Sequence, residues 1–319
     1  ELDAIINQFS KTKVKKMKPL IRAILRSAVY QIKYMDSIPD HAVCSESVKL
    51  AVKKGFSGLR GYVNGVLRSV VKGIDEVEYP SDPIKRLSVR YSCPEWIIRL
   101  WKETYDLSLI ETMLKDFQTE KPTTIRRCRS RITMEQLKKR LEEEHVLVEN
   151  HPYLKDALLI SKYDYLESLE TFREGLFVVQ DISSMLVGEL AHVQAGAQVI
   201  DLCAAPGGKS TEPGGKALDV AERILMEGQA GCSGHVEARD LTEYKVSLIE
   251  ENIERMGLCN VTAVCQDASV YDEKSAGKAD IVIADLPCSG LGVLGKKTDL
   301  KYKASPEGIV SLVKLQRKI

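Results

Sequence analysis

The run DLCAAPGGK, from Asp201 to Lys209, decides the fold of the second half of this chain. It follows the apolar residues AQVI and combines an acid, small residues, two glycines and a lysine. Glycines let the backbone turn tightly and approach a ligand closely, and the start of a following helix offers free N–H groups to an anion. The run therefore predicts a ligand-binding loop between a strand and a helix.

Short apolar runs surround this loop, and each ends in an aspartate or just beyond one. They are AQVIDL (197–202), HVEARD (235–240), VTAVCQD (261–267) and ADIVIADLP (279–287). Helical segments separate them, of which residues 242–257 are the clearest. Alternating strands and helices predict an α/β domain, a parallel sheet with helices on both faces. Ligands bind such sheets at the carboxyl ends of the strands. The acids expected at that edge are Asp201, Asp240, Asp267 and Asp285.

Two kinds of cofactor compete for the loop. A phosphate-binding loop requires GxxxxGK[ST]. Gly208, Lys209 and Ser210 fit its end, but Cys203 stands where the first glycine is required. The alternative is a loop that wraps the amino-acid end of S-adenosyl-L-methionine, which carries a carboxylate rather than phosphates. The acid that ends the second strand favours this methyl donor.

Two of the strand-end acids have a candidate role in holding the cofactor. Asp240 can accept hydrogen bonds from both ribose hydroxyls, as in dinucleotide-binding folds. The alternative is a helix cap, because residues 240–243 also fit a capping box. Asp267 can accept from the adenine amino group, or else it caps a turn. We favour cofactor binding at both positions.

A second PGGK, at residues 213–216, follows the first. Asp240 lies 31 residues after Lys209, whereas about 20 residues usually separate the glycines from this acid. The excess indicates an insertion or a local duplication. We expect the first PGGK, at 206–209, to be the working copy, because it directly follows a strand.

The fourth apolar run ends in DLPCSG, residues 285–290. Cys288 follows a proline and is expected to be exposed at the ligand edge. A cysteine there can act as a thiolate if Lys209 or a helix start lowers its pKa. An inert core cysteine is the alternative.

The first half of the chain is helical and basic. Residues 1–72 contain 14 Lys/Arg and 5 Asp/Glu, a net +9, which suggests either a nucleic-acid partner or a solvated helical surface. Lys11, Lys13, Lys15, Lys16, Lys18, Arg22 and Arg26 are candidates for one basic stripe. Residues 73–90, with Pro80 and Pro83, are predicted to be a linker, and 94–117 to be helical. Residues 121–172 predict a small α+β module with basic residues at Arg126, Arg127, Arg129 and Arg131.

Composition narrows the class of protein further. The chain has 319 residues, enough for about two domains. Eight cysteines without CxxC pairs argue against zinc, and we expect no metal. No apolar run approaches the roughly 18–20 residues of a membrane span, so no membrane partner is expected. A cytoplasmic protein with reduced thiols is the simplest expectation.

Taken in order, DLCAAPGGK, VEARD, QDAS and DLPCSGLGV resemble the S-adenosylmethionine-dependent RNA cytosine-5 methyltransferases. FVVQDISSMLVGEL (177–190) is similar to the lead-in helix of that family. KMKPLIRAILRSAVYQI, IPDHAV and GYVNGVLRSV resemble a NusB-like RNA-binding domain, and RYSCPEWI (90–97) the linker helix after it. This combination resembles the bacterial Sun/RsmB family, which methylates 16S ribosomal RNA. It implies a Rossmann-like methyltransferase domain at 173–319, an all-α NusB-like domain at 1–72, and an RNA-recognition module at 73–172.

The resemblance also assigns site residues. The cofactor loop would comprise Cys203, Ala204, Ala205, Pro206, Gly207, Gly208 and Lys209. Asp240 would hold the ribose and Asp267 the adenine, while Asp285 would contact both the cofactor and the target base. Pro287 would contact a cytosine flipped out of its stack.

The family uses two cysteines for its reaction. One attacks C6 of cytosine, so that C5 becomes nucleophilic enough to take the methyl group. The resemblance gives Cys288 the other role, release of the methylated base. The attacking cysteine belongs to a later Thr-Cys motif, and the chain stops at Ile319 before any such motif. We therefore expect a sequence truncated at both ends and without turnover of its own. The alternatives are a non-catalytic NusB-like RNA-binding protein, or a methyltransferase for proteins or small molecules.

Overall fold

The computed structural model describes residues 1–205, 214–227 and 234–319. Within these ranges, no helix is both long and apolar enough to cross a membrane. The chain divides into two compact units, described separately below. Unit 1 comprises residues 1–119 and 290–303, and unit 2 comprises residues 120–289 and 304–319.

Unit 1 begins with helices that share one apolar core. They are α1 (Leu2–Phe9), α2 (Pro19–Tyr34), α3 (Asp40–Lys53) and α4 (Arg60–Gly73), with 3-10 turns at Val14–Lys16, Ser57–Leu59 and Ile74–Glu76. Ile21, Leu25 and Leu67 are among its buried residues, each at most 1% exposed. The apolar periodicity of residues 1–72 therefore predicted helices correctly.

A second helical layer completes unit 1. It contains α5 (Pro83–Arg90), α6 (Glu95–Lys102), α7 (Leu107–Asp116) and α13 (Leu300–Lys303). The predicted linker at 73–90 is wrong over its second half. Pro83 begins α5 instead of breaking a helix, and the Asp82 side chain caps that helix by accepting from Lys85 N at 2.8 Å. Proline suits the first turn of a helix because no intrahelical partner is needed there.

Unit 2 begins with an antiparallel sheet of strand order β2-β3-β1-β4. Its elements are β1 (Thr123–Arg127), α8 (Met134–Glu143), β2 (Leu147–Asn150), β3 (Ala157–Ser161), α9 (Glu170–Arg173) and β4 (Phe177–Val179). This is the α+β module expected at 121–172. The sheet extends beyond residue 172, because β4 pairs with β1.

The second sheet is parallel, with strand order β7-β6-β5-β8. Its strands are β5 (Gln198–Asp201), β6 (His235–Asp240), β7 (Val261–Cys265) and β8 (Ile281–Ile283). The helices of this part are α10 (Ile182–Leu190), α11 (Gly215–Glu227), α12 (Glu243–Met256) and α14 (Pro306–Lys318). All four predicted strands are present, and together with the helices they confirm the Rossmann-like fold class.

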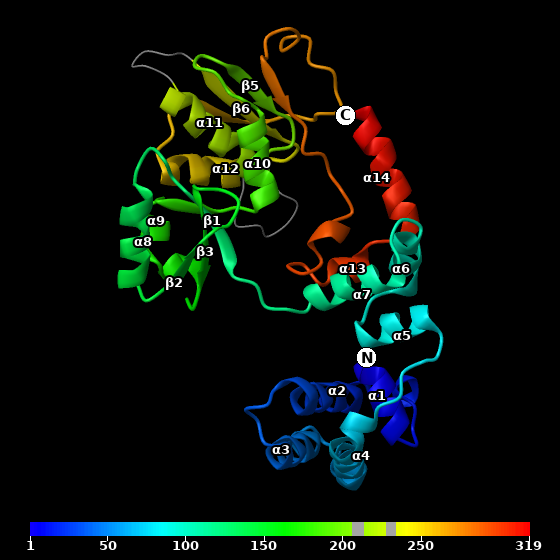
Figure 1. The fold of residues 1–319 in the computed structure, drawn as a ribbon. Coiled ribbons are helices and arrows are strands. Elements are labelled where there is room, and N and C mark those ends of the chain that lie inside the picture. Colours follow the sequence, from blue (N-terminus) through cyan, green and yellow to red (C-terminus); the bar gives the residue numbers. More distant parts are fainter. Residues whose placement is uncertain (206–213, 228–233) are drawn as a thin grey trace. The chain divides into compact units, whose positions relative to one another are not determined.

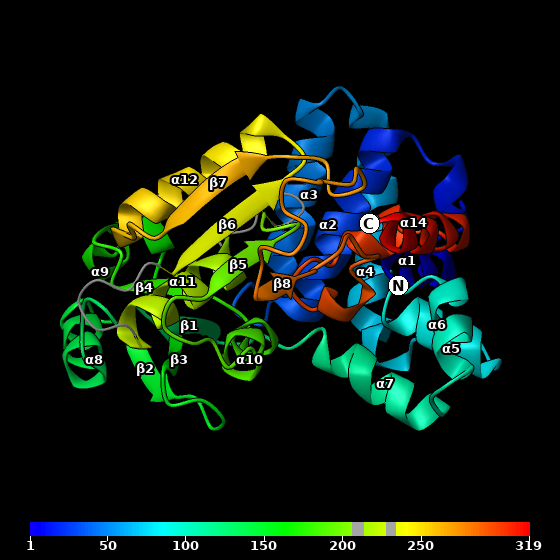
Figure 2. The same cartoon turned by 90° about the horizontal axis from the view of Figure 1, so that it is seen from above.

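Helices α10, α11 and α12 lie on one face of this parallel sheet (Figure 1). Leu218 of α11 and Ile249 of α12 pack with Val199, Val236 and Ala238 of the strands, and Figure 1 shows α10, α11 and α12 on the same side of the sheet. Figure 2 looks onto the strands from the other side.

The opposite face of the sheet carries polar residues. Glu237 and Arg239 border a cavity of about 590 Å³, which is lined on the loop side by residues such as Asp272 and Lys278. The expectation of helices on both faces is therefore not met in the described part of the chain. Because Glu237 and Arg239 alternate with buried Val236 and Ala238, β6 has the pattern of a half-covered strand.

Candidate active site at the carboxyl edge of the parallel sheet

The register of the parallel strands brings two acids to one edge. Asp201 pairs with Ala238 of β6 and with Ile283 of β8, and Asp240 pairs with Cys265 of β7. Strand ends aligned in this way place the side chains that follow them around a common site.

Asp240 anchors the turn after β5. It is 3% exposed, and its carboxylate accepts from Ala205 N at 3.0 Å and from Leu241 N at 2.7 Å. The Lys245 ammonium lies 2.9 Å from Oδ1. Thr242, not Asp240, caps α12 by accepting from Lys245 N. The helix-cap alternative for Asp240 is therefore wrong, and its role toward ribose stays a prediction.

Asp201 is the most deeply buried acid of the edge. Burial raises its pKa to about 7, with neighbouring Asp285 and Asp240 adding to the rise. Its hydrogen bond from Cys203 N, at 3.3 Å, and the Lys216 ammonium act in the opposite direction. Because the pKa of Asp201 lies near neutral pH, the charge of any bound ligand can change the protonation state of this carboxyl group.

Asp267 is exposed and caps a turn. Its Oδ1 accepts from Ser269 N at 2.8 Å, and hydrogen bonds from Ser269 hold the pKa of Asp267 below its ordinary value. The turn-capping alternative describes this geometry. One carboxylate oxygen can accept more than one hydrogen bond, so a contact to adenine stays a prediction.

The segment after β8 carries the remaining predicted residues. Asp285 forms an ion pair with Lys216 of α11. The carbonyl oxygen of Pro287 accepts from Gln316 of α14 at 2.7 Å. Cys288 is exposed, as expected. The chemistry available here is therefore a carboxylate held by a cation, next to an accessible thiol.

The predicted cofactor loop is described only in part. Cys203 is half-buried, and burial raises the pKa of its thiol. Ala204 and Ala205 are buried, and Ala204 N donates to Arg239 O at 2.8 Å. Pro206, Gly207, Gly208 and Lys209 lie outside the described residues.

Cys265 is a further exposed cysteine at this edge, and it is the last residue of β7. Its Sγ donates to Leu241 O at 3.5 Å. Loss of solvation and the Glu243 carboxylate raise the pKa of Cys265, which makes it a poor source of thiolate.

The basic residues of the α+β module are engaged in a buried ionic cluster that sequence reasoning missed. Arg126, fully buried, lies 2.5 Å from Glu222 and donates to Gln180 at 2.7 Å. Arg129 lies 2.7 Å from Asp219.

The neighbouring arginines of the module are also occupied. Arg127 lies 2.6 Å from Asp156, and Arg131 donates to the backbone oxygen of Arg255. These four arginines join β1 and its loop to the rest of unit 2, so they are not a free basic surface.

Comparison with known proteins agrees with this architecture. Residues 1–72 match the NusB family, and residues 93–165 match the ferredoxin-like domain of RsmF/B-like methyltransferases. Residues 189–319 match the family described as 16S rRNA methyltransferase RsmB/F.

Sequence similarity along the whole of this chain identifies its family. The chain is 32% identical over 320 residues to the probable ribosomal RNA small subunit methyltransferase B of Bacillus subtilis, spanning 100% of this chain and 68% of that protein. The chain belongs to the ribosomal RNA small subunit methyltransferase B family. The Proteus mirabilis member of this family is 28% identical and is spanned over 71% of its length.

Solved structures show the same fold. The crystal structure of PH0851 superposes with a TM-score of 0.73 at 23% identity, covering 99% of this chain and 69% of that one. NSun6 from Pyrococcus horikoshii, crystallised with SFG, superposes with a TM-score of 0.58 at 20% identity, covering 69% of this chain and 76% of that one. Members of the methyltransferase B family are RNA (cytosine-5) methyltransferases that depend on S-adenosyl-L-methionine.

The edge residues of this family member fit that cofactor. Each Asp240 oxygen already accepts a backbone N–H, and a carboxylate oxygen has a second lone pair for a ribose hydroxyl. A ribose would compete with the Lys245 ammonium, whose side chain is 31% exposed and can turn to solvent. The loop contacts of Asp240 need not break when the cofactor binds.

Proposed function

We propose that this chain binds S-adenosyl-L-methionine at the carboxyl edge of β5, β6 and β8, for methylation of C5 of a cytosine in 16S ribosomal RNA. The observation that carries the proposal is the meeting of buried Asp240, the Lys216–Asp285 pair and exposed Cys288 at this edge. Membership of the family supports the reaction class, and the description of the family as 16S rRNA methyltransferases supports the 16S substrate.

Each edge residue has a distinct role in the proposal. Asp240 binds the ribose hydroxyls and keeps the β5 turn closed through Ala205 N. Asp267 binds the adenine end, and Asp285 contacts the cofactor and orients the base beside Pro287. The cofactor supplies the methyl group. A base flipped out of its stack can reach these side chains because Asp285, Pro287 and Cys288 are exposed.

The reaction requires a thiolate that adds to C6 of cytosine. C5 then takes the methyl group and loses its proton, and the S–C6 bond breaks, which returns the thiolate. We propose that Cys288 assists the release step. Cys93 and Cys128 are poor candidates for the attacking group, since burial raises the pKa of Cys93 to about 11 and that of Cys128 to about 12.

An RNA that traps the covalent cysteine adduct tests this division of roles. A 16S fragment with 5-azacytidine at the target position traps a cysteine adduct, because N5 carries no proton to lose. We expect the 319-residue chain to bind this RNA without forming a complex that survives denaturing electrophoresis. The longer Bacillus subtilis relative is the positive control, which checks that this RNA can form a covalent complex. A surviving complex that Cys288→Ser abolishes would mean that Cys288 attacks the base.

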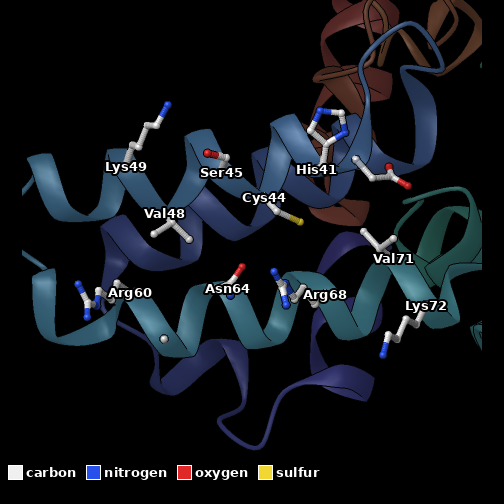
Figure 3. A pocket seen from close by; sticks show the side chains of 12 residues that line it. His41, Cys44, Ser45, Val48, Lys49, Arg60, Asn64, Arg68, Val71 and Lys72 are labelled. Atoms are coloured by element: carbon white, nitrogen blue, oxygen red, sulfur yellow. The ribbon is translucent and has the colours of Figure 1, made fainter.

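A groove between α3 and α4 supports RNA binding by unit 1. It has a volume of about 970 Å³. On α4 the lining includes Arg60, Arg68 and Lys72, and none of these cations has an ion-pair partner among the described residues. Figure 3 shows Lys49 and His41 of α3 along the other wall of the groove.

The spacing of these cations suits a polyanion. Arg60, Asn64, Arg68 and Lys72 recur every four residues, which puts them in one row along α4. Asp40 is the single acid among the lining residues. By contrast, Arg26 of the predicted basic stripe is held by Asp3 at 2.6 Å. We propose that RNA phosphates bind in the groove.

The salt dependence of binding tests the groove. Replacing Arg60 and Arg68 by glutamine should weaken binding of a 16S fragment. It should also reduce the slope of log K against log salt by about 1.4, since each phosphate contact on a single strand contributes about 0.7. Fluorescence anisotropy at several salt concentrations measures both. The control is Lys53→Gln with Lys54→Gln, at the C-terminal end of α3 and outside the lining. An unchanged slope in the Arg60/Arg68 variant would contradict the proposal.

A further inference from the structure

The sequence between β5 and α11 contains a tandem repeat. PGGKSTE, residues 206–212, is followed directly by PGGKALD, residues 213–219. Removing the first copy would join Ala205 to Pro213 and regenerate the string DLCAAPGGK without any other change. The chain therefore holds two candidates for one functional segment.

The second copy returns to the turn that leaves β5. Gly214 N donates to Ala204 O at 3.0 Å. Gly214 has a φ of +78°, and an added Cβ would lie 3.2 Å from the Ile249 side chain, so this position requires glycine. The ends of the intervening segment are thus held as close as the ends of a β-turn, whose first C=O accepts from the fourth N–H.

The second copy also starts the helix that carries the site's cation. α11 begins at Gly215, and Lys216 is its second residue. The Lys216 side chain, 18% exposed, pairs with Asp285 at the end of β8. Asp240 lies 24 residues after Lys216 but 31 after Lys209, and only the shorter gap is near the usual spacing of about 20.

We propose that Gly214, Gly215 and Lys216 of the second copy form the working glycine-lysine segment of the cofactor loop, and that residues 206–212 are a dispensable insertion. Lys216 is a positioning residue that holds Asp285 at the edge. This reverses the expectation that the first PGGK works because it follows a strand. The binding test of this inference rests on the proposed cofactor site, whereas its stability test is independent of that site.

The stability test needs no ligand. Deleting residues 206–212 should leave the thermal midpoint unchanged or raise it, because a shorter closed loop costs less entropy and the Ala204–Gly214 bond is retained. A clear fall in the midpoint would overturn the inference, whether or not the parent chain binds S-adenosyl-L-methionine.

The binding test compares the two lysines by calorimetric titration with S-adenosyl-L-methionine. Lys216→Met should weaken binding about tenfold, the size of a charged hydrogen bond, whereas Lys209→Met should change it less than about twofold. Lys216→Arg should restore most of the affinity. In an Asp285→Asn background, Lys216→Met should add little further loss, which a general loss of stability would not produce. Weakening by Lys209→Met alone would overturn the inference.

Discussion

Replacing Arg126 by methionine is expected to lower the free energy of unfolding by about 3–5 kcal/mol, the usual cost of removing one partner of a buried ion pair. Arg126 is fully buried between Glu222 and Gln180, and Asp219 lies 3.5 Å away. Burial alone would raise the pKa of Asp219, but the charges of Arg126, Arg129 and Arg223 hold it below its ordinary value. Without Arg126, Glu222 loses its 2.5 Å ion pair and keeps its hydrogen bonds from Ser130 and a longer contact to Arg129.

Urea denaturation of the parent and the variant measures this effect. The double variant Arg126→Met with Glu222→Met should recover much of the loss, because an apolar pair can replace a buried ion pair at little cost. A loss below about 1 kcal/mol in Arg126→Met would show that the pair does not stabilise the junction. The same helix, α11, carries Lys216, so this cluster also fixes one wall of the proposed cofactor site.

Asp201→Asn is expected to stabilise the chain above neutral pH. The unfolded carboxyl group ionises near pH 4, whereas burial raises the folded pKa to about 7. Between these values the folded chain holds a proton that the unfolded chain has released. Stability therefore falls as the pH rises from about 4 to about 7, and is constant above. Three pKa units correspond to roughly 4 kcal/mol as an upper value.

Asparagine resembles the protonated acid and keeps an acceptor for Cys203 N. The variant should unfold at a higher urea concentration than the parent at pH 8, and the two should converge toward pH 4. Asp280→Asn, at the amino edge of the same sheet, is the control, and it should keep the pH dependence of the parent. A parent-like slope in Asp201→Asn would contradict a raised pKa at Asp201.

The sequence was informative wherever a pattern is local. Apolar runs ending in aspartate located all four parallel strands, because a buried strand needs a continuous apolar stretch. The exposure of Cys288, in the segment after β8, followed from the same logic. Pro83 led to the wrong prediction of a linker, because proline can either end a helix or begin one. The Asp82 side chain, which caps α5, shows that Pro83 begins a helix here.

Long-range pairing was beyond reach of the sequence. Nothing in the local sequence around Arg126 and Arg129 reveals that Asp219 and Glu222, some 90 residues later, neutralise these arginines. The repeated PGGK posed the same difficulty. Proximity in sequence favoured residues 206–209, while the contact that matters, between Gly214 and Ala204, depends on where α11 packs.

A calorimetric titration of the 319-residue chain with S-adenosyl-L-methionine tests the central claim most directly. The proposed site predicts one cofactor per chain, with binding weakened roughly 100-fold or more by Asp240→Ala, because two hydrogen bonds to a buried carboxylate are lost. Asp280→Ala should bind like the parent. Absence of binding by the parent chain, or equal binding by Asp240→Ala, would contradict a cofactor site at the carboxyl edge of this sheet.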